Sequence, residues 1–162
     1  MVIGRQQPLT ELIAVGEQSS VGARVAWLVG AEGVGKSTLA RAAAQRSGLP
    51  VHRLDVYPED RDHPLASLTE LALTLGSDPG GELADDPAHA LLRALEAAGP
   101  CCVVIEDAQW LDEASQLAVW QVVRRFRRLP VWLVVTSTDD TGTLFDGLTL
   151  LLRSPDAGQI FP

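Results

Sequence analysis

A segment of eight residues near the start of the chain constrains the fold more than any other feature. Residues 30–37 read GAEGVGKS and satisfy the pattern G-x-x-x-x-G-K-[ST]. An apolar run at residues 25–29 precedes the segment, and a helical pattern follows it to about Arg46. A phosphate-binding loop requires this order, because it joins a buried strand to the amino terminus of a helix. The segment therefore predicts a phosphate-binding loop in an α/β domain.

The residue types within the segment fit this chemistry. Gly30, Gly33 and Gly35 let the backbone curl, so that several N–H groups converge on phosphate oxygens, and the helix amino terminus adds its positive dipole. Lys36 is the only lysine among the 13 basic residues. A slim ammonium on a long stem suits a cramped loop better than a planar guanidinium. We expect Lys36 to reach the β- and γ-phosphates and the Ser37 hydroxyl to bind Mg²⁺.

Short apolar runs alternate with helical patterns along the rest of the chain, which is typical of parallel βαβ units. Further strands are expected at residues 51–56, 101–105 and 131–136. Helices are expected at about residues 9–17, 64–75 with Pro64 in the first turn, 87–98, 113–128 and 144–152, and residues 76–86 form the longest polar loop. One domain covers residues 1–162, and residues 159–161 begin a strand that the chain leaves incomplete. We therefore expect a C-terminally truncated fragment of a larger protein.

Two adjacent acids, Glu106 and Asp107, follow the most apolar of these strands. Phosphate loops work with a carboxylate at the tip of a nearby strand, which holds Mg²⁺, and a further acid can polarise the attacking water. The sequence leaves open which of the two acids has which role. Asp112 is better explained as a helix N-cap than as a site residue. Four arginines are best explained as cations that offset the dipole of a helix end: Arg124, Arg125, Arg127 and Arg128.

Composition and charge exclude several other classes of protein. The formal net charge is −8, which disfavours a general binder of nucleic acid or anionic membranes. No run approaches the roughly 18 apolar residues of a membrane span, and no secretory signal precedes the first helix. The adjacent Cys101 and Cys102 form no metal-binding pair and are expected as buried thiols of a reducing cytoplasm. The three histidines lack metal-ligand spacing. A cytoplasmic protein is therefore expected.

Four segments together resemble the ATPase domain of the STAND class (signal-transduction ATPases with numerous domains), as in large ATP-binding LuxR-type bacterial transcriptional regulators. Residues 2–12 are similar to an N-terminal box that in this family lies near the adenine, and residues 30–37 are the phosphate loop. Residues 59–75 and residues 103–115, which read VVIEDAQWLDEAS, are similar to two later segments of the family. The pattern around Gln109, Trp110 and Asp112 is the most specific part of the resemblance.

The resemblance implies a three-layer α/β P-loop NTPase fold, with helices on both faces of a parallel sheet in the order 5-1-4-3-2. It implies ATP or ADP with Mg²⁺, slow hydrolysis, and a nucleotide state used as a switch. It also implies self-association or signalling through attached domains, with no direct DNA binding by this segment. One departure concerns turnover. Many relatives carry an arginine that senses the γ-phosphate where this chain has Thr138.

The candidate residues divide into three groups. Nucleotide binding is assigned to Gly4, Arg5, Gly30, Ala31, Glu32, Gly33, Val34, Gly35, Lys36, Ser37 and Thr38. Catalysis is assigned to Lys36, Glu106 and Asp107, and metal binding to Ser37, Glu106 and Asp107. The functional hypothesis is an ATP/ADP–Mg²⁺ switch domain with weak ATPase activity. A small P-loop kinase and a non-catalytic nucleotide-binding scaffold are the alternatives.

Overall fold

A computed structural model describes residues 6–162 of the chain. Its strands are β1 (Arg24–Val29), β2 (Val51–Asp55), β3 (Cys101–Glu106), β4 (Val131–Ser137) and β5 (Gly158–Phe161). Its α-helices are α1 (Gln6–Glu17), α2 (Lys36–Arg46), α3 (Ala66–Thr74), α4 (Glu82–Asp85), α5 (Pro87–Ala98), α6 (Glu113–Arg125) and α7 (Thr143–Leu151). Short 3₁₀ helices include η2 (Pro58–Asp62), η3 (Ala108–Trp110) and η4 (Phe126–Arg128).

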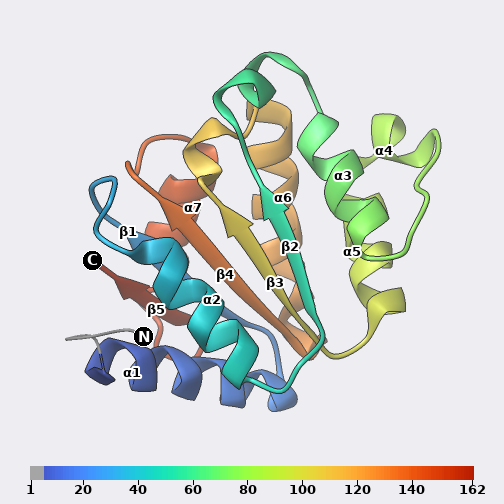
Figure 1. The fold of residues 1–162 in the computed structure, drawn as a ribbon. Helices are drawn as coiled ribbons and strands as arrows, with labels where there is room; N and C mark the ends of the chain where they lie inside the picture. The colour runs from blue at the N-terminus through green and yellow to red at the C-terminus, as the bar shows by residue number, and fades with distance from the viewer. Residues whose placement is uncertain (1–5) are drawn as a thin grey trace.

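The strands form one parallel sheet in the order β2-β3-β4-β1-β5 (Figure 1). This is the order 5-1-4-3-2 expected from the resemblance, written in the opposite direction. Residues 158–161 pair with β1, so the strand expected at the end of the chain is formed. Because the strands are parallel, all of their carboxyl ends lie along one edge of the sheet, and the segments that follow them gather there.

Helices cover both faces of the sheet, which gives the predicted three layers (Figure 1). Apolar side chains of α1 and α2 pack on one face with alternate residues of β1, β3 and β4. The remaining alternate residues pack on the other face against α3, α5, α6 and α7. Since both faces are covered, β3 and β4 are apolar over residues 101–105 and 131–135, as parallel strands buried on both sides require, and polar residues appear only at their carboxyl ends. β3 and β4 are buried at every position.

Three element predictions need correction. Pro64 is not in the first turn of a helix, because Leu65 takes a left-handed conformation (φ 64°) and α3 begins at Ala66. The segment at residues 76–86 is not wholly a loop, since α4 lies within it and Leu83 is buried. The helix capped by Asp112 ends at Arg125 and tightens into the 3₁₀ helix η4, instead of continuing to residue 128. Tightening of a last turn is common at helix ends.

Candidate nucleotide-binding site

The phosphate-loop segment lies where the sequence predicts it, between β1 and α2. Gly33 and Gly35 have φ angles of 79° and 89°, in the left-handed region that glycine adopts without strain. Gly35 is the N-cap of α2, so free N–H groups of the first turn of a helix of 11 residues face the loop. The Gly30 N–H donates to the Ser137 carbonyl at 3.2 Å, which fixes the start of the loop to the end of β4. The backbone has the geometry of an anion-binding loop.

Lys36 lies within this loop with only 9% of its surface exposed. Its Nζ donates to the carbonyl oxygens of Gly30 and Ala31 at 2.7 and 2.9 Å. These two bonds hold the ammonium over the loop, within a few ångströms of its backbone. Ser37 is half-buried and Thr38 is exposed at the amino end of the same helix. The loop, the lysine and the hydroxyl are therefore contiguous, as the motif requires.

The acidic turn after β3 contains a strained residue. Asp107 has φ 57° and ψ 45°, a left-handed conformation that is uncommon for non-glycine residues, although Asp and Asn adopt it more often than most. Its N–H donates to the Thr136 hydroxyl of β4 at 3.0 Å, and Thr136 is fully buried. Such strain persists where the surroundings impose it, and it concentrates at functional sites. Asp107 is half-buried at the same edge of the sheet as the phosphate loop.

Glu106, the other acid, is buried and bound by arginines. Its carboxylate Oε1 lies 3.0 Å from Arg41 Nε on α2 and 3.2 Å from Arg53 Nε on β2. Arg53 also pairs with Asp55, which neighbours Glu106 across the two strands. The hydrogen bond to Glu106 and the charge of that carboxylate raise the pKa of the Arg41 guanidinium above its ordinary value. We call Arg41, Arg53, Asp55 and Glu106 the arginine–glutamate cluster.

Sequence reasoning identified Glu106 but missed its partners. Arg41 lies four residues after Ser37 in α2, and this spacing could have placed it beside the site. Arg53 gave no comparable signal, because its contact with Glu106 depends on how β2 and β3 pair. The sequence pattern included Gln109 but assigned it no role, and its buried Oε1 accepts the Thr138 N–H at 3.2 Å.

Gln109 also links the acidic turn to a third segment. The Gln109 carbonyl accepts a hydrogen bond from Arg61 Nη2 of η2 at 2.9 Å. The Arg61 guanidinium lies over the Trp110 ring, 4.9 Å from its centroid, in a cation–π arrangement. Gln109 and Trp110 thus hold together the segments that follow β2, β3 and β4. This is a physical role for the part of the sequence on which the family resemblance was most specific.

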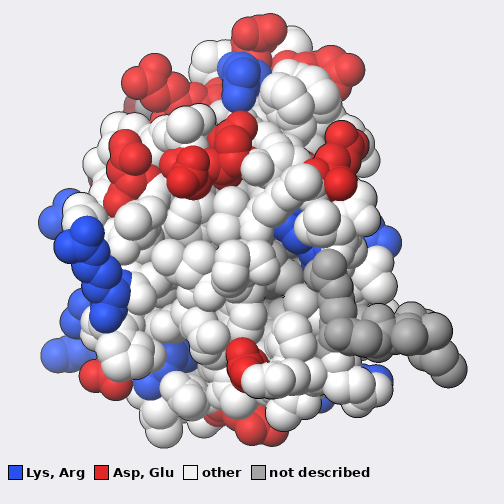
Figure 2. All heavy atoms as spheres, turned by 90° about the vertical axis from the view of Figure 1, so that its left-hand side faces the viewer, with Lys and Arg blue, Asp and Glu red and all other residues white. Residues whose placement is uncertain are grey.

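A hollow of about 330 Å³ lies beside the phosphate loop. Residues from α1, the loop and β5 line it, including Pro8, Glu11, Val34, Lys36, Ile160 and Phe161. The face on the left of Figure 1, where α1, the loop and β5 lie, carries acidic side chains along its upper part and a broad area without charged side chains across its middle (Figure 2). Gly4 and Arg5, predicted near the adenine, lie outside the described residues.

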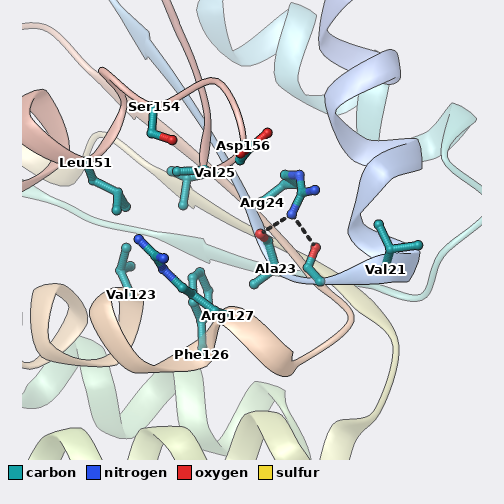
Figure 3. A pocket seen from close by; sticks show the side chains of 12 residues that line it. Val21, Ala23, Arg24, Val25, Val123, Phe126, Arg127, Leu151, Ser154 and Asp156 are labelled. Carbon is teal, nitrogen blue, oxygen red and sulfur yellow. Dashed lines mark hydrogen bonds between the residues drawn. The ribbon is translucent and has the colours of Figure 1, made fainter.

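A second hollow, of about 250 Å³, lies at the opposite edge of the sheet (Figure 3). It is lined by residues at the amino end of β1, by η4 and by the segment between α7 and β5. The Arg24 guanidinium there donates to the carbonyls of Gly22 and Ala23 at 3.1 and 3.0 Å. Ligands of open α/β sheets bind beyond the carboxyl ends of the strands, and this hollow is at the amino ends. It is therefore not our candidate nucleotide site.

The remaining sequence predictions concern caps, thiols, metals and membranes. Asp112 is the N-cap of α6, accepting the Ser115 N–H at 2.9 Å, as expected. Both cysteines are free and buried, and burial raises the pKa of the Cys102 thiol to about 12. Within residues 6–162, no group of three or more His, Cys, Asp and Glu side chains is arranged to hold a metal. No helix of the described part of the chain is long and apolar enough to cross a membrane.

The sheet order and the loop between β1 and α2 define the three-layer α/β fold of the P-loop NTPases. Residues 1–135 match the family described as AAA ATPase domain, so the chain belongs to that family.

Two individual similarities accompany this match. The structure of PCH-2 from C. elegans shares the fold with a TM-score of 0.55 and 18% identity, over 96% of this chain and 42% of that one. An uncharacterized protein of Rhizobium meliloti (strain 1021) is 45% identical over 56 residues, which are 32% of this chain and 5% of the relative. The matched region is thus a small part of that relative.

Proposed function

We propose that this chain is the nucleotide-binding switch domain of a larger signalling or transcription-regulatory ATPase, which binds ATP or ADP with Mg²⁺ and hydrolyses ATP slowly. The observation that carries the proposal is the meeting of two segments at one edge of the sheet. The phosphate loop with Lys36 and the strained acidic turn at Asp107 are both anchored to the end of β4. A glycine-rich turn without function would not need the second element.

Lys36 Nζ leaves the carbonyls of its own loop and binds the β- and γ-phosphate oxygens, while the N–H groups of residues 30–38 hold the phosphates. The Asp107 carboxylate orients the attacking water. Ser37 and Glu106 offer the hard oxygen ligands that Mg²⁺ prefers. A few such ligands suffice, because Mg²⁺ keeps several waters, and the ion would neutralise charge on the phosphates.

The hollow beside the loop is our candidate for the adenine subsite. It adjoins Lys36 at one end and is lined by apolar side chains of β1 and β5, such as Leu28 and Ile160. An adenine ring is flat and uncharged, so an apolar hollow adjoining the phosphate-binding lysine suits it. Glu11 of α1 also lines the hollow, and its carboxylate can accept a hydrogen bond from an exocyclic amine.

The switch role rests on the resemblance to STAND and LuxR-type regulators and on the weak turnover that we expect from Thr138. Thr138 supplies a hydroxyl where many such relatives have an arginine, so the γ-phosphate lacks a cation at that position. Slow hydrolysis suits a switch protein, because the ATP-bound and ADP-bound forms then persist long enough to signal. We further propose self-association or contacts with attached domains as the output, and the cytoplasm as the location. A non-catalytic nucleotide-binding scaffold is the second candidate, and Thr138 is the residue that favours it.

The test compares the chain with its Lys36→Ala variant. Nucleotide that copurifies with each is identified by chromatography, and ATP turnover is measured with and without candidate phosphate acceptors. The proposal predicts bound ADP or ATP and slow turnover in the unmodified chain, with nucleotide affinity at least a hundredfold lower in the variant. Acceptor-dependent consumption of ATP would favour a kinase. Equal nucleotide affinity in both proteins would refute the assignment of the loop.

A further inference from the structure

The arginine–glutamate cluster lies between the two elements that supply candidate metal ligands. Arg41 is four residues after Ser37 in α2, so the two side chains lie on the same face of the helix, one turn apart. Its guanidinium reaches across to Glu106 at the end of β3. Arg41 therefore adjoins one candidate ligand in sequence and binds the other directly.

Both oxygens of the Glu106 carboxylate are engaged. Oε1 accepts from Arg41 Nε at 3.0 Å and lies 3.2 Å from Arg53 Nε, and Oε2 accepts from Arg41 Nη2 at 3.5 Å. The Glu106 side chain is 4% exposed, so water competes weakly for these oxygens. A metal ion needs a carboxylate lone pair, and two adjacent guanidinium charges repel a divalent cation. Glu106 in this arrangement is poorly available to a metal.

The two arginines differ in how easily they can leave Glu106. Arg53 has a second carboxylate partner, Asp55, within the cluster. Arg41 pairs with Glu106 alone among the described residues, and half of its side chain (50%) is exposed. Arg53 is 36% exposed and stays tied to Asp55 next to Glu106, whereas the more exposed Arg41 guanidinium can move fully into water when it leaves Glu106. Arg41 is therefore the arginine that can leave the Glu106 carboxylate at the lower cost in free energy.

We propose that Arg41 competes with Mg²⁺ for the Glu106 carboxylate and thereby lowers the affinity of the nucleotide site for the metal. The inference rests on the proposed nucleotide function and deepens it, because it names the residue that sets the metal dependence. When the metal–nucleotide complex binds, the ion pair between Arg41 and Glu106 would be replaced by the attraction between Glu106 and the metal. The free Arg41 then faces solvent or the phosphates one helical turn away.

The experiment measures how strongly Mg²⁺ and nucleotide binding are coupled. The Kd of a fluorescent ATP analogue is determined with excess Mg²⁺ and with EDTA. The coupling is the Kd with EDTA divided by the Kd with Mg²⁺. Arg41→Gln removes the competing charge. Arg46→Gln, the same substitution in the last turn of the same helix, is the matched control, and Arg41→Lys keeps the charge but loses the guanidinium fork. Mn²⁺ binding followed by electron paramagnetic resonance gives a second readout, independent of turnover.

We expect Arg41→Gln to raise the coupling about fivefold and to tighten Mn²⁺ binding similarly, a magnitude at the upper end for the loss of one partly exposed ion pair. Arg46→Gln should match the unmodified chain, and Arg41→Lys should lie between. An unchanged coupling in Arg41→Gln would overturn the inference while leaving nucleotide binding intact. An equal change of both Kd values is such an outcome, because it leaves their ratio the same. Absence of nucleotide binding in every protein would instead refute the proposed function itself.

Discussion

Replacement of Thr136 by valine removes one hydrogen bond of the acidic turn. The Thr136 hydroxyl accepts the Asp107 N–H at 3.0 Å, and this bond ties the strained turn to β4. Valine has nearly the same shape as threonine, so the substitution leaves little cavity at a fully buried position. The change therefore tests the hydrogen bond and not the packing.

The structure sets the size of the expected effect. An N–H left without a partner costs about 1–3 kcal/mol when it is buried. Asp107 is half-exposed, so water can reach its backbone and the cost falls near the lower bound. We expect the free energy of unfolding to fall by about 1 kcal/mol, and Tm to fall by about 3 °C in a domain of this size. Without its anchor the Asp107 carboxylate loses its position, so kcat should fall about tenfold with little change in KM.

The assay combines urea unfolding with steady-state ATP turnover. Thr74→Val, the same substitution at an exposed position of α3, is the control and should leave kcat unchanged. If Thr136→Val retains both the stability and the kcat of the unmodified chain, the bond does not position Asp107. A loss of stability with unchanged kcat would show that it holds the fold but not the catalytic carboxylate.

Three further predictions concern turnover, the edge strand and pH. Thr138→Arg should raise ATP turnover by supplying a cation at that position, and a fall or no change would contradict the proposed resemblance to the STAND class. Gly158→Ala should cost more than about 3 kcal/mol of unfolding free energy in a denaturant titration, since its Cβ would overlap the Val25 carbonyl and detach β5; unchanged stability would refute that strand pairing. Burial raises the pKa of Cys102 to about 12, so above about pH 8.5 the unfolded thiol ionises while the folded one does not. Stability should then fall as pH rises toward 12, by at most about 1.4 kcal/mol per pH unit for this thiol. Cys102→Ala should flatten the profile, and an identical slope in both proteins would contradict the assignment.

The helices and strands that were predicted correctly have signals contained in a few adjacent residues. Gly48 predicts the end of α2, and Asp86-Pro87 predicts the start of α5, because caps and helix breakers act locally. The start of α3 was missed, since Pro64 has the sequence signal of a first helical turn although Leu65 is left-handed. The helix α4 was missed because its four residues make only about one turn, so no repeating apolar pattern can reveal it.

The sequence by itself determined the position of the candidate phosphate loop, the position of the acidic pair and the parallel α/β class. A loop of consecutive residues carries its own geometry, and apolar runs buried on both faces are recognisable in one dimension. Only the tertiary structure decided what surrounds Glu106 and Asp107. Arg53 and Thr136 reach these acids through the pairing of β3 with its two neighbours, from residues 53 and 29 positions away. Such contacts depend on strand order and register, which no local pattern encodes.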